Sequence, residues 1–404
     1  MTIRTRRRTT LLGALTAPAL ALALTACGGS SDSGSDSGKP SAQTSGSGET
    51  AEPKVASFPV GKPFGDAVWT ARISTPSMGS VIKSRGAPVA VRADRVLVEY
   101  QKFNTRAVQA FSDTGEKVWT HKLSEHAQVL FLDKTVAVLE KGESKASGLD
   151  KPGQVTKVTL LSQADGSAVS ETEIPDTVAT NGFATLAYYE GESVRVLSEA
   201  GKPLEAPGVS ATKDVGLIGE IPFWRDEDRN VTTASWSAGK DLGIDTSDLI
   251  ESEVQAIDNK QGLMLLSVTS GPRAERTFYG VKADTGKAFE IDCPNARETD
   301  SFTDVTTNSP NGQYGVIDSV VLSGTEGRCL GGGEQKDVKL TAVDDNGTAY
   351  GTAEENELAV ITADGKAEVS QLPGGASAPI GVMKGDIAVH WNQSAGILSG
   401  NPIK

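Results

Sequence analysis

Cysteine, histidine and aromatic residues are scarce in this chain of 404 residues. It contains three Cys and three His, and Phe, Trp and Tyr together make up 5%. Three Cys cannot form the dense disulfide network that supports many small secreted domains. Basic residues are also in deficit, because 39 Lys and Arg against 52 Asp and Glu give a net charge of −13. This deficit excludes a general nucleic-acid-binding protein, since phosphate contacts require Lys and Arg.

Glycine, in contrast, is abundant, with 44 residues, while hydrophobic residues reach only 38%. The composition favours a fold with many turns over one with long helices. The length allows either one large core or several smaller ones.

The first 27 residues have the pattern of an export signal. Four Arg within residues 4–8 precede an apolar run over residues 11–24, which is too short to span a membrane. The run ends in LTAC, with Cys27 followed by Gly28. This resembles the lipobox of bacterial lipoprotein signal peptides, in which the leader is cut before the Cys and the Cys sulfur carries a diacylglycerol. We predict a signal peptide over residues 1–26 and a lipid on Cys27, with an ordinary secretory signal as the alternative and the choice between Sec and twin-arginine export left open.

Residues 27–56 contain the lipidated Cys and a segment rich in Gly, Ser and acidic residues. With almost no apolar side chain it cannot form a core, so we predict a disordered tether that spans on the order of 30 Å. Removal of residues 1–26, which hold four Arg and no acid, leaves 35 bases and 52 acids, a net charge of −17. We therefore expect the lipid, and not a basic patch, to hold the chain at the extracytoplasmic face of the cell membrane.

The remaining residues, 57–404, repeat one pattern. A short apolar strand, a polar hairpin, a second strand and a Gly-containing turn recur, most clearly over residues 347–366. Similar units occupy residues 95–119, 135–166, 183–202, 262–287 and 386–398, with weaker ones at 231–240 and 314–347. About eight units of about 44 residues are typical of a β-propeller, since each small sheet can bury its faces only against neighbours in a ring. We predict an all-β propeller of eight blades, with seven as the alternative.

Two of these turns carry the resemblance to a known family. Residues 113–119 read DTGEKVW and residues 284–287 read DTGK. They resemble the repeats of pyrroloquinoline-quinone-like β-propellers, in which the Gly and Trp dock neighbouring blades. The resemblance implies the scaffold and no bound quinone, because the stacking Trp, calcium site and vicinal disulfide of quinoprotein dehydrogenases have no counterparts in the sequence.

The chain termini predict how the ring closes. Residues 66–72 read as a single strand, and the last unit stops soon after its second strand. We expect the N-terminal strand to complete the C-terminal blade, which would remove two free sheet edges.

Candidate sites are few. Cys293 and Cys329 are predicted to form a disulfide worth roughly 3–4 kcal/mol, with two free thiols as the alternative. The three His (His121, His126 and His390) lack metal-ligand spacing with a Cys. The acidic segments at residues 226–228, 245–253 and 344–347 do not fit a calcium loop. We therefore predict no catalytic residue, no metal and no cofactor, since no hydrolase, metalloprotease or nucleotide-binding motif is present either.

These features favour a membrane-anchored binding or scaffold module that is not an enzyme. Its partners would be the membrane, through the lipid on Cys27, and a protein or small molecule that the sequence does not identify. A quinoprotein-type oxidoreductase and a surface solute-binding protein are the alternatives.

Overall fold

The computed structural model describes residues 59–74, 88–143, 153–175, 178–180, 185–207, 209, 215–226, 230–241, 249–258, 262–270, 275–292, 306–317, 319–329, 338–353 and 356–404. The chain divides into two units, Met1–Glu52 and Pro53–Lys404, and every described residue belongs to the second. The predicted signal peptide, the lipidation site Cys27 and the tether lie outside the described residues.

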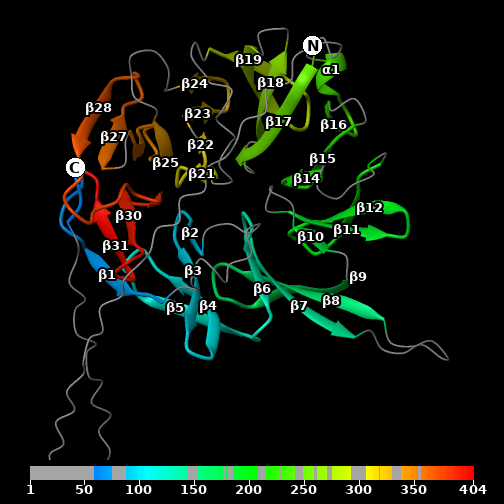
Figure 1. Cartoon of the computed structure of the whole chain (residues 1–404), viewed down its shortest axis with the longest axis horizontal. Coiled ribbons are helices and arrows are strands. Elements are labelled where there is room, and N and C mark those ends of the chain that lie inside the picture. Colours follow the sequence, from blue (N-terminus) through cyan, green and yellow to red (C-terminus); the bar gives the residue numbers. More distant parts are fainter. Residues whose placement is uncertain are drawn as a thin grey trace, which may run out of the picture. The chain divides into compact units, whose positions relative to one another are not determined.

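The second unit is built from β-strands. Its 31 described strands form eight antiparallel sheets, and a single described helix, α1 (Ala238–Asp241), accompanies them. The sheets follow one another around a ring in sequence order, from cyan through green and yellow to red in Figure 1. The prediction of an eight-bladed propeller is thus confirmed.

We number the blades in chain order. Blade 1 contains β2 (Val89–Val91), β3 (Val96–Lys102), β4 (Thr105–Phe111) and β5 (Lys117–Leu123). Blade 2 contains β6 (Gln128–Phe131), β7 (Thr135–Glu143), β8 (Gln154–Ser162) and β9 (Ala168–Pro175). Blade 3 contains β10 (Val178–Thr180), β11 (Leu186–Glu190), β12 (Ser193–Leu197) and β13 (Pro203–Glu205). Blade 4 contains β14 (Val215–Ile218), β15 (Ile221–Arg225) and β16 (Val231–Thr233).

The second half of the ring has the same plan. Blade 5 contains β17 (Leu249–Asp258), β18 (Leu263–Ser270), β19 (Glu275–Lys282) and β20 (Ala288–Ile291). Blade 6 contains β21 (Thr306–Asn308), β22 (Tyr314–Ile317), β23 (Val320–Ser323) and β24 (Gly327–Cys329). Blade 7 contains β25 (Lys339–Val343), β26 (Ala349–Thr352), β27 (Glu357–Ile361) and β28 (Ala367–Gln371). Blade 8 contains β29 (Gly381–Met383), β30 (Ile387–Asn392), β31 (Ile397–Pro402) and β1 (Trp69–Arg72).

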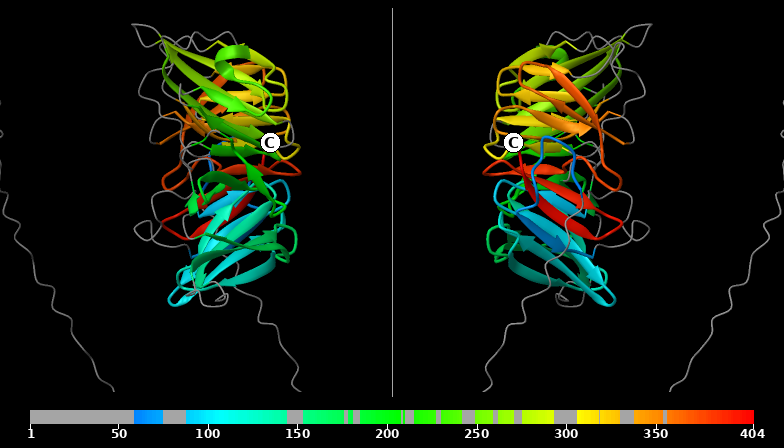
Figure 2. Two further views of the ribbon diagram at one scale, coloured as in Figure 1. Left: turned by 90° about the vertical axis from the view of Figure 1, so that its right-hand side faces the viewer. Right: turned by 90° about the vertical axis from the view of Figure 1, so that its left-hand side faces the viewer.

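Blade 8 closes the ring with strands from both ends of the unit. Strand β1 pairs antiparallel with β31, with Trp69 opposite Gly400 and Arg72 opposite Ile397. Figure 2 shows β1 in blue beside the red strands of the C-terminus. The prediction of closure by the N-terminal strand is therefore confirmed.

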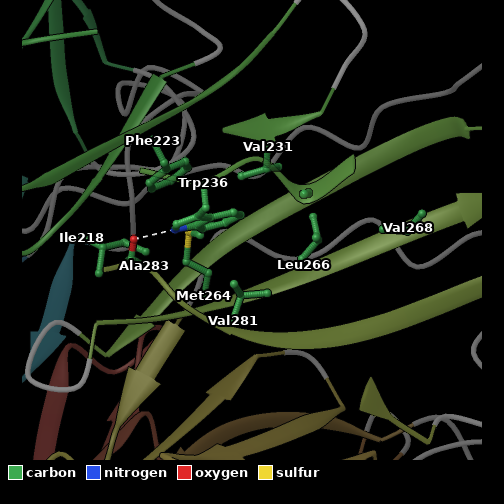
Figure 3. Close-up of a cluster of buried hydrophobic side chains, with 10 residues drawn as sticks. Ile218, Phe223, Val231, Trp236, Met264, Leu266, Val268, Val281 and Ala283 are labelled. Carbon is green, nitrogen blue, oxygen red and sulfur yellow. Dashed lines mark hydrogen bonds between the residues drawn. The ribbon is translucent and has the colours of Figure 1, made fainter. Parts of the chain in front are cut away.

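The hydrophobic core lies between the blades. Eight clusters of buried side chains occur, and each joins two consecutive blades. Figure 3 shows the cluster in which Phe223 and Trp236 of the blade 4 region pack on Met264, Leu266 and Val281 of blade 5. Each blade therefore buries its apolar side chains against its two neighbours.

At several of these interfaces, a tryptophan side chain of one blade packs against a glycine turn of the next. The indoles of Trp69, Trp119 and Trp236 lie so close to a Gly of the next blade that a Cβ there would fall within 2.9 Å of ring atoms. The Gly residues are Gly115, Gly166 and Gly286 respectively. Trp119 Nε1 also donates to Gln163 O (3.0 Å), and Trp236 Nε1 donates to Ala283 O (2.7 Å).

Between blades 6 and 7, Arg328 makes the hydrogen bonds to the neighbouring turn that a Trp makes at other interfaces. Its guanidinium donates to the carbonyl oxygens of Thr362 (3.1 Å), Ala363 and Gly347 (3.2 Å). Thr362 precedes Gly365 by three residues, as Gln163 precedes Gly166, so an arginine fork replaces the indole N–H at the equivalent carbonyl. A Cβ on Gly365 would meet no atom within 4 Å, in agreement with the absence of a ring over this turn.

Candidate functional site

The ring has two different faces. Because neighbouring strands are antiparallel, the turns after the first and third strands of each blade lie on one face, which we call the turn face. The turns after the second strands and the connections between blades lie on the other, the loop face. Two backbone hydrogen bonds between blades 8 and 1 are consistent with this assignment of the faces. Lys384 N donates to Ala93 O (2.7 Å) on the turn face, and Gln101 N donates to Ser74 O (2.7 Å) on the loop face.

Connection length separates the two faces clearly. Between the strands that the structure describes, turn-face connections have at most five residues, except in three-stranded blade 4, where residues 234–248 follow the third strand, β16, and so begin on the turn face. Six loop-face connections have nine or more residues: 73–88, 144–153, 206–214, 292–305, 330–338 and 372–380. Long connections on a rigid scaffold are where binding surfaces usually occur, so the loop face is the candidate functional surface.

A partly buried polar network connects turns on the turn face of blades 1–3. Oε2 of Glu199, in the last turn of blade 3, accepts hydrogen bonds from Lys134 N (2.7 Å), Thr135 N (2.8 Å) and Thr135 Oγ1 (2.9 Å) in blade 2. Burial raises the pKa of the Glu199 carboxyl, while these hydrogen bonds act to lower it. The carboxylate therefore connects two blades, and its oxygen accepts from two backbone N–H groups and one hydroxyl.

Arg92 extends this network to blade 1. Its guanidinium donates to Leu132 O (2.8 Å) in the first turn of blade 2, and burial lowers its pKa despite the nearby charges of Asp133 and Glu199. Gln163 Nε2 donates to the same Leu132 O (3.0 Å) and to Asp133 O (3.1 Å). These polar groups hold backbone turns in place.

Sequence reasoning missed this network. Glu199 stands where other turns carry Asp or Ala, and no periodic pattern distinguishes it. The available signal was an acidic residue directly before the Ala-Gly-Lys turn, which spacing alone could not connect to Thr135.

The structure describes only one of the two cysteines of the predicted disulfide. Cys329 lies in β24 and is disulfide-bonded. Cys293 lies outside the described residues, so its pairing with Cys329 stays a prediction.

The three His lie in three different environments. His121 is half-buried in β5, and His126 is exposed in the connection to blade 2. His390 is fully buried in β30, where Nδ1 lies 2.9 Å from Ser377 O and burial lowers the ring's pKa to about 4. A buried neutral imidazole of this kind is a packing residue.

Two of the acidic segments contribute an aspartate, Asp344 or Asp226, that closes a turn. Asp344 forms a turn in which Oδ1 accepts from Asn346 N and Thr348 N, both at 2.9 Å, and Oδ2 accepts from Tyr350 Oη (2.9 Å). Asp226 closes the turn before β16 by accepting from Asn230 N (2.8 Å), whereas the side chains of residues 245–253 lie outside the described set. Among the described residues, no group of three His, Cys, Asp or Glu could hold a metal ion, and no helix is long and apolar enough to cross a membrane.

No protein-family model matches the sequence, and no curated protein matches it. Dipeptidyl peptidase 4 of Porphyromonas gingivalis is similar in structure, with 11% identity, a TM-score of 0.41, and coverage of 82% of this chain and 62% of the peptidase. AztD of Citrobacter koseri has 11% identity, a TM-score of 0.30 and coverage of 80% and 76%. TolB of Acinetobacter baumannii has 12% identity, a TM-score of 0.29 and coverage of 72% and 67%. The fold assignment therefore rests on the eight sheets of this chain.

Proposed function

We propose that the protein is a lipid-anchored, extracytoplasmic β-propeller that acts as a non-catalytic binding or scaffold module. The observation that carries this proposal is the difference between the faces of the ring: mostly short, hydrogen-bonded turns on one face and six long connections on the other. A closed ring with a core at every blade interface holds the strand ends that flank these connections in fixed relative positions. That arrangement suits a surface that recognises a partner.

The N-terminal pattern supports the anchor. The leader, the LTAC sequence and the Gly/Ser-rich segment that follows Cys27 are consistent with a tethered lipoprotein. The described chain enters the ring on the turn face, where Lys404 N donates to Pro63 O (3.1 Å) and Ile403 N donates to Asp386 O (2.9 Å).

The anchor is tested by growing cells with an alkyne-bearing palmitate and isolating the protein from membranes. The proposal predicts label on a peptide that begins with Cys27, and release of a Cys27→Ser variant from the membrane fraction. Unlabelled protein that remains membrane-bound in the variant would contradict the anchor.

A further inference from the structure

Phe103 occupies an unusual position at the tip of the β3–β4 hairpin. Of the aromatic side chains that the structure describes, only Phe103 is exposed, with 88% of its surface accessible. The hairpin turn lies on the loop face and is closed by the pairing of Lys102 with Thr105.

The backbone at Phe103 is strained as well. Its φ is +51°, in the left-handed region that glycine tolerates and a bulky side chain rarely adopts. Glycine would suit this turn position better, and it would remove an exposed aromatic ring from water. Strain and exposure at one residue indicate a side chain retained for a contact.

The base of the hairpin is firmly braced. Arg106 Nη2 pairs with the Glu99 carboxylate at 2.6 Å, and Arg106 Nη1 donates to the carbonyl of Glu125 in the neighbouring connection. The tip itself consists of exposed Lys102, Phe103 and Asn104. It therefore presents one apolar ring and one ammonium group on a supported hairpin.

The size and charge of this tip favour a lipid surface over a protein. A stable protein interface needs about 800 Å² on each side, far more than one side chain supplies. An aromatic ring beside a lysine suits the boundary between lipid headgroups and acyl chains. We propose that the Lys102–Phe103 tip inserts into the headgroup region of a phospholipid bilayer and turns the loop face toward the membrane.

This inference rests on the proposed anchor, which makes a weak contact sufficient. A tether keeps the tip at a high effective concentration near the bilayer, so that the contact only has to select one orientation. The described chain begins on the opposite face, but the reach predicted for the tether, on the order of 30 Å, exceeds the roughly 24 Å length of a seven-residue strand such as β3. The acidic charges elsewhere are screened beyond about 8 Å at physiological salt. A partner of the loop face would then itself lie at the membrane surface.

Vesicle co-sedimentation tests the tip independently of the lipid. We would use the chain from residue 27 with Cys27→Ser and vesicles of equal parts phosphatidylglycerol and phosphatidylcholine. Phe103→Gly should lower the bound-to-free ratio by about tenfold or more, while its melting temperature stays the same or rises because the strained φ is relieved. The control Val169→Ser changes another exposed apolar residue, 52% accessible on β9, and should bind as the parent does.

A depth measurement completes the test. Phe103→Trp in the lipidated full chain should add a fluorescence component to that of the parent's five Trp, and lipids brominated near the headgroup should quench this added component in the vesicles stated above. Equal vesicle binding by the parent and Phe103→Gly, or an unquenched Trp at this position, would overturn the proposal. If Phe103→Gly lost a crosslink to a protein that the parent forms, while its vesicle binding stayed unchanged, the tip would contact a protein. That result would also overturn the proposal. Failure of Cys27 lipidation would be detected separately by acyl labelling.

Discussion

The ring of Phe64 meets the imidazole of His390 edge to face, with centroids 4.7 Å apart and planes at 75°. Phe64 belongs to the segment before β1, and His390 to β30, so this contact joins the two ends of the unit inside blade 8. Phe64 also lies 5.4 Å from the ring of Tyr350 in blade 7. Ring closure therefore depends on side-chain packing between blades 7 and 8 in addition to the pairing of β1 with β31.

Truncation of Phe64 should weaken ring closure. The side chain is 7% exposed, and Phe64→Ala should lower the free energy of unfolding by about 3–5 kcal/mol in urea denaturation. Val68→Ala is the control, because Val68 lies nearby in the chain but is 61% exposed, and its effect should be within about 0.5 kcal/mol. Equal effects of the two substitutions would contradict a closing role for Phe64.

Acid should destabilise the ring through His390. Burial lowers its folded-state pKa to about 4 from 6.5, so the unfolded chain takes up the proton first as pH falls. The stability that neutral His390 contributes is complete above pH 6.5 and declines toward pH 4, by about 3 kcal/mol in total. Urea denaturation between pH 7 and pH 4 measures this loss.

A His390→Gln variant separates this effect from the carboxylates, whose titration both proteins share. The raised pKa of Glu199 has the opposite sign, since it favours the folded state as pH falls. The difference between parent and variant should shrink as pH falls through the window from 6.5 to 4. A difference independent of pH would show that His390 does not titrate as described.

Two turn glycines form a matched pair for testing the docking of Trp119. Gly166 and Gly365 both have positive φ, +72° and +83°, so alanine strains the backbone at either position. A Cβ on Gly166 would also lie 2.8 Å from Trp119 Cδ2, whereas a Cβ on Gly365 would meet nothing within 4 Å. We expect Gly166→Ala to destabilise by about 2 kcal/mol more than Gly365→Ala, because it displaces the indole and its hydrogen bond. Identical shifts in melting temperature for the two variants would argue against the docking of Trp119 on Gly166.

Arg328 should be essential to the interface of blades 6 and 7. Arg328→Met keeps an apolar stem but leaves the carbonyl groups of Thr362 and Gly347 without this donor, at a cost of about 2 kcal/mol in unfolding free energy. Arg328→Lys retains the charge but not the planar fork and should recover only part of that loss. Full recovery by lysine would mean that charge alone matters there.

Much of the fold was predictable because each blade repeats the same local chemistry. Alternating apolar strands and Gly turns such as residues 113–119 predicted the blades, and residues 66–72 predicted closure. Blade 4 departed from the repeat, because Trp236 is followed by α1 where a fourth strand would run, and only a bridge between Thr232 and Ser237 remains.

The contacts between blades were less predictable. Arg328 has in blade 6 the place that Trp119 has in blade 1, and Glu199 binds a turn more than 60 residues earlier, at Thr135. Neither residue type signals its partner, because the partner atoms are backbone groups. The strained Phe103 was likewise invisible, since a Phe-Asn pair is not a typical hairpin turn.

Photocrosslinking in cells tests the central claim, that the loop face is the binding surface, most directly. A photoreactive residue would be placed at exposed Glu192 or Ser394 on the loop face, and at exposed Asp165 or Asp364 on the turn face. The account predicts a discrete adduct with a component of the membrane from the loop-face positions and none from the turn-face positions. Adducts of equal yield from both faces, or from the turn face alone, would contradict it.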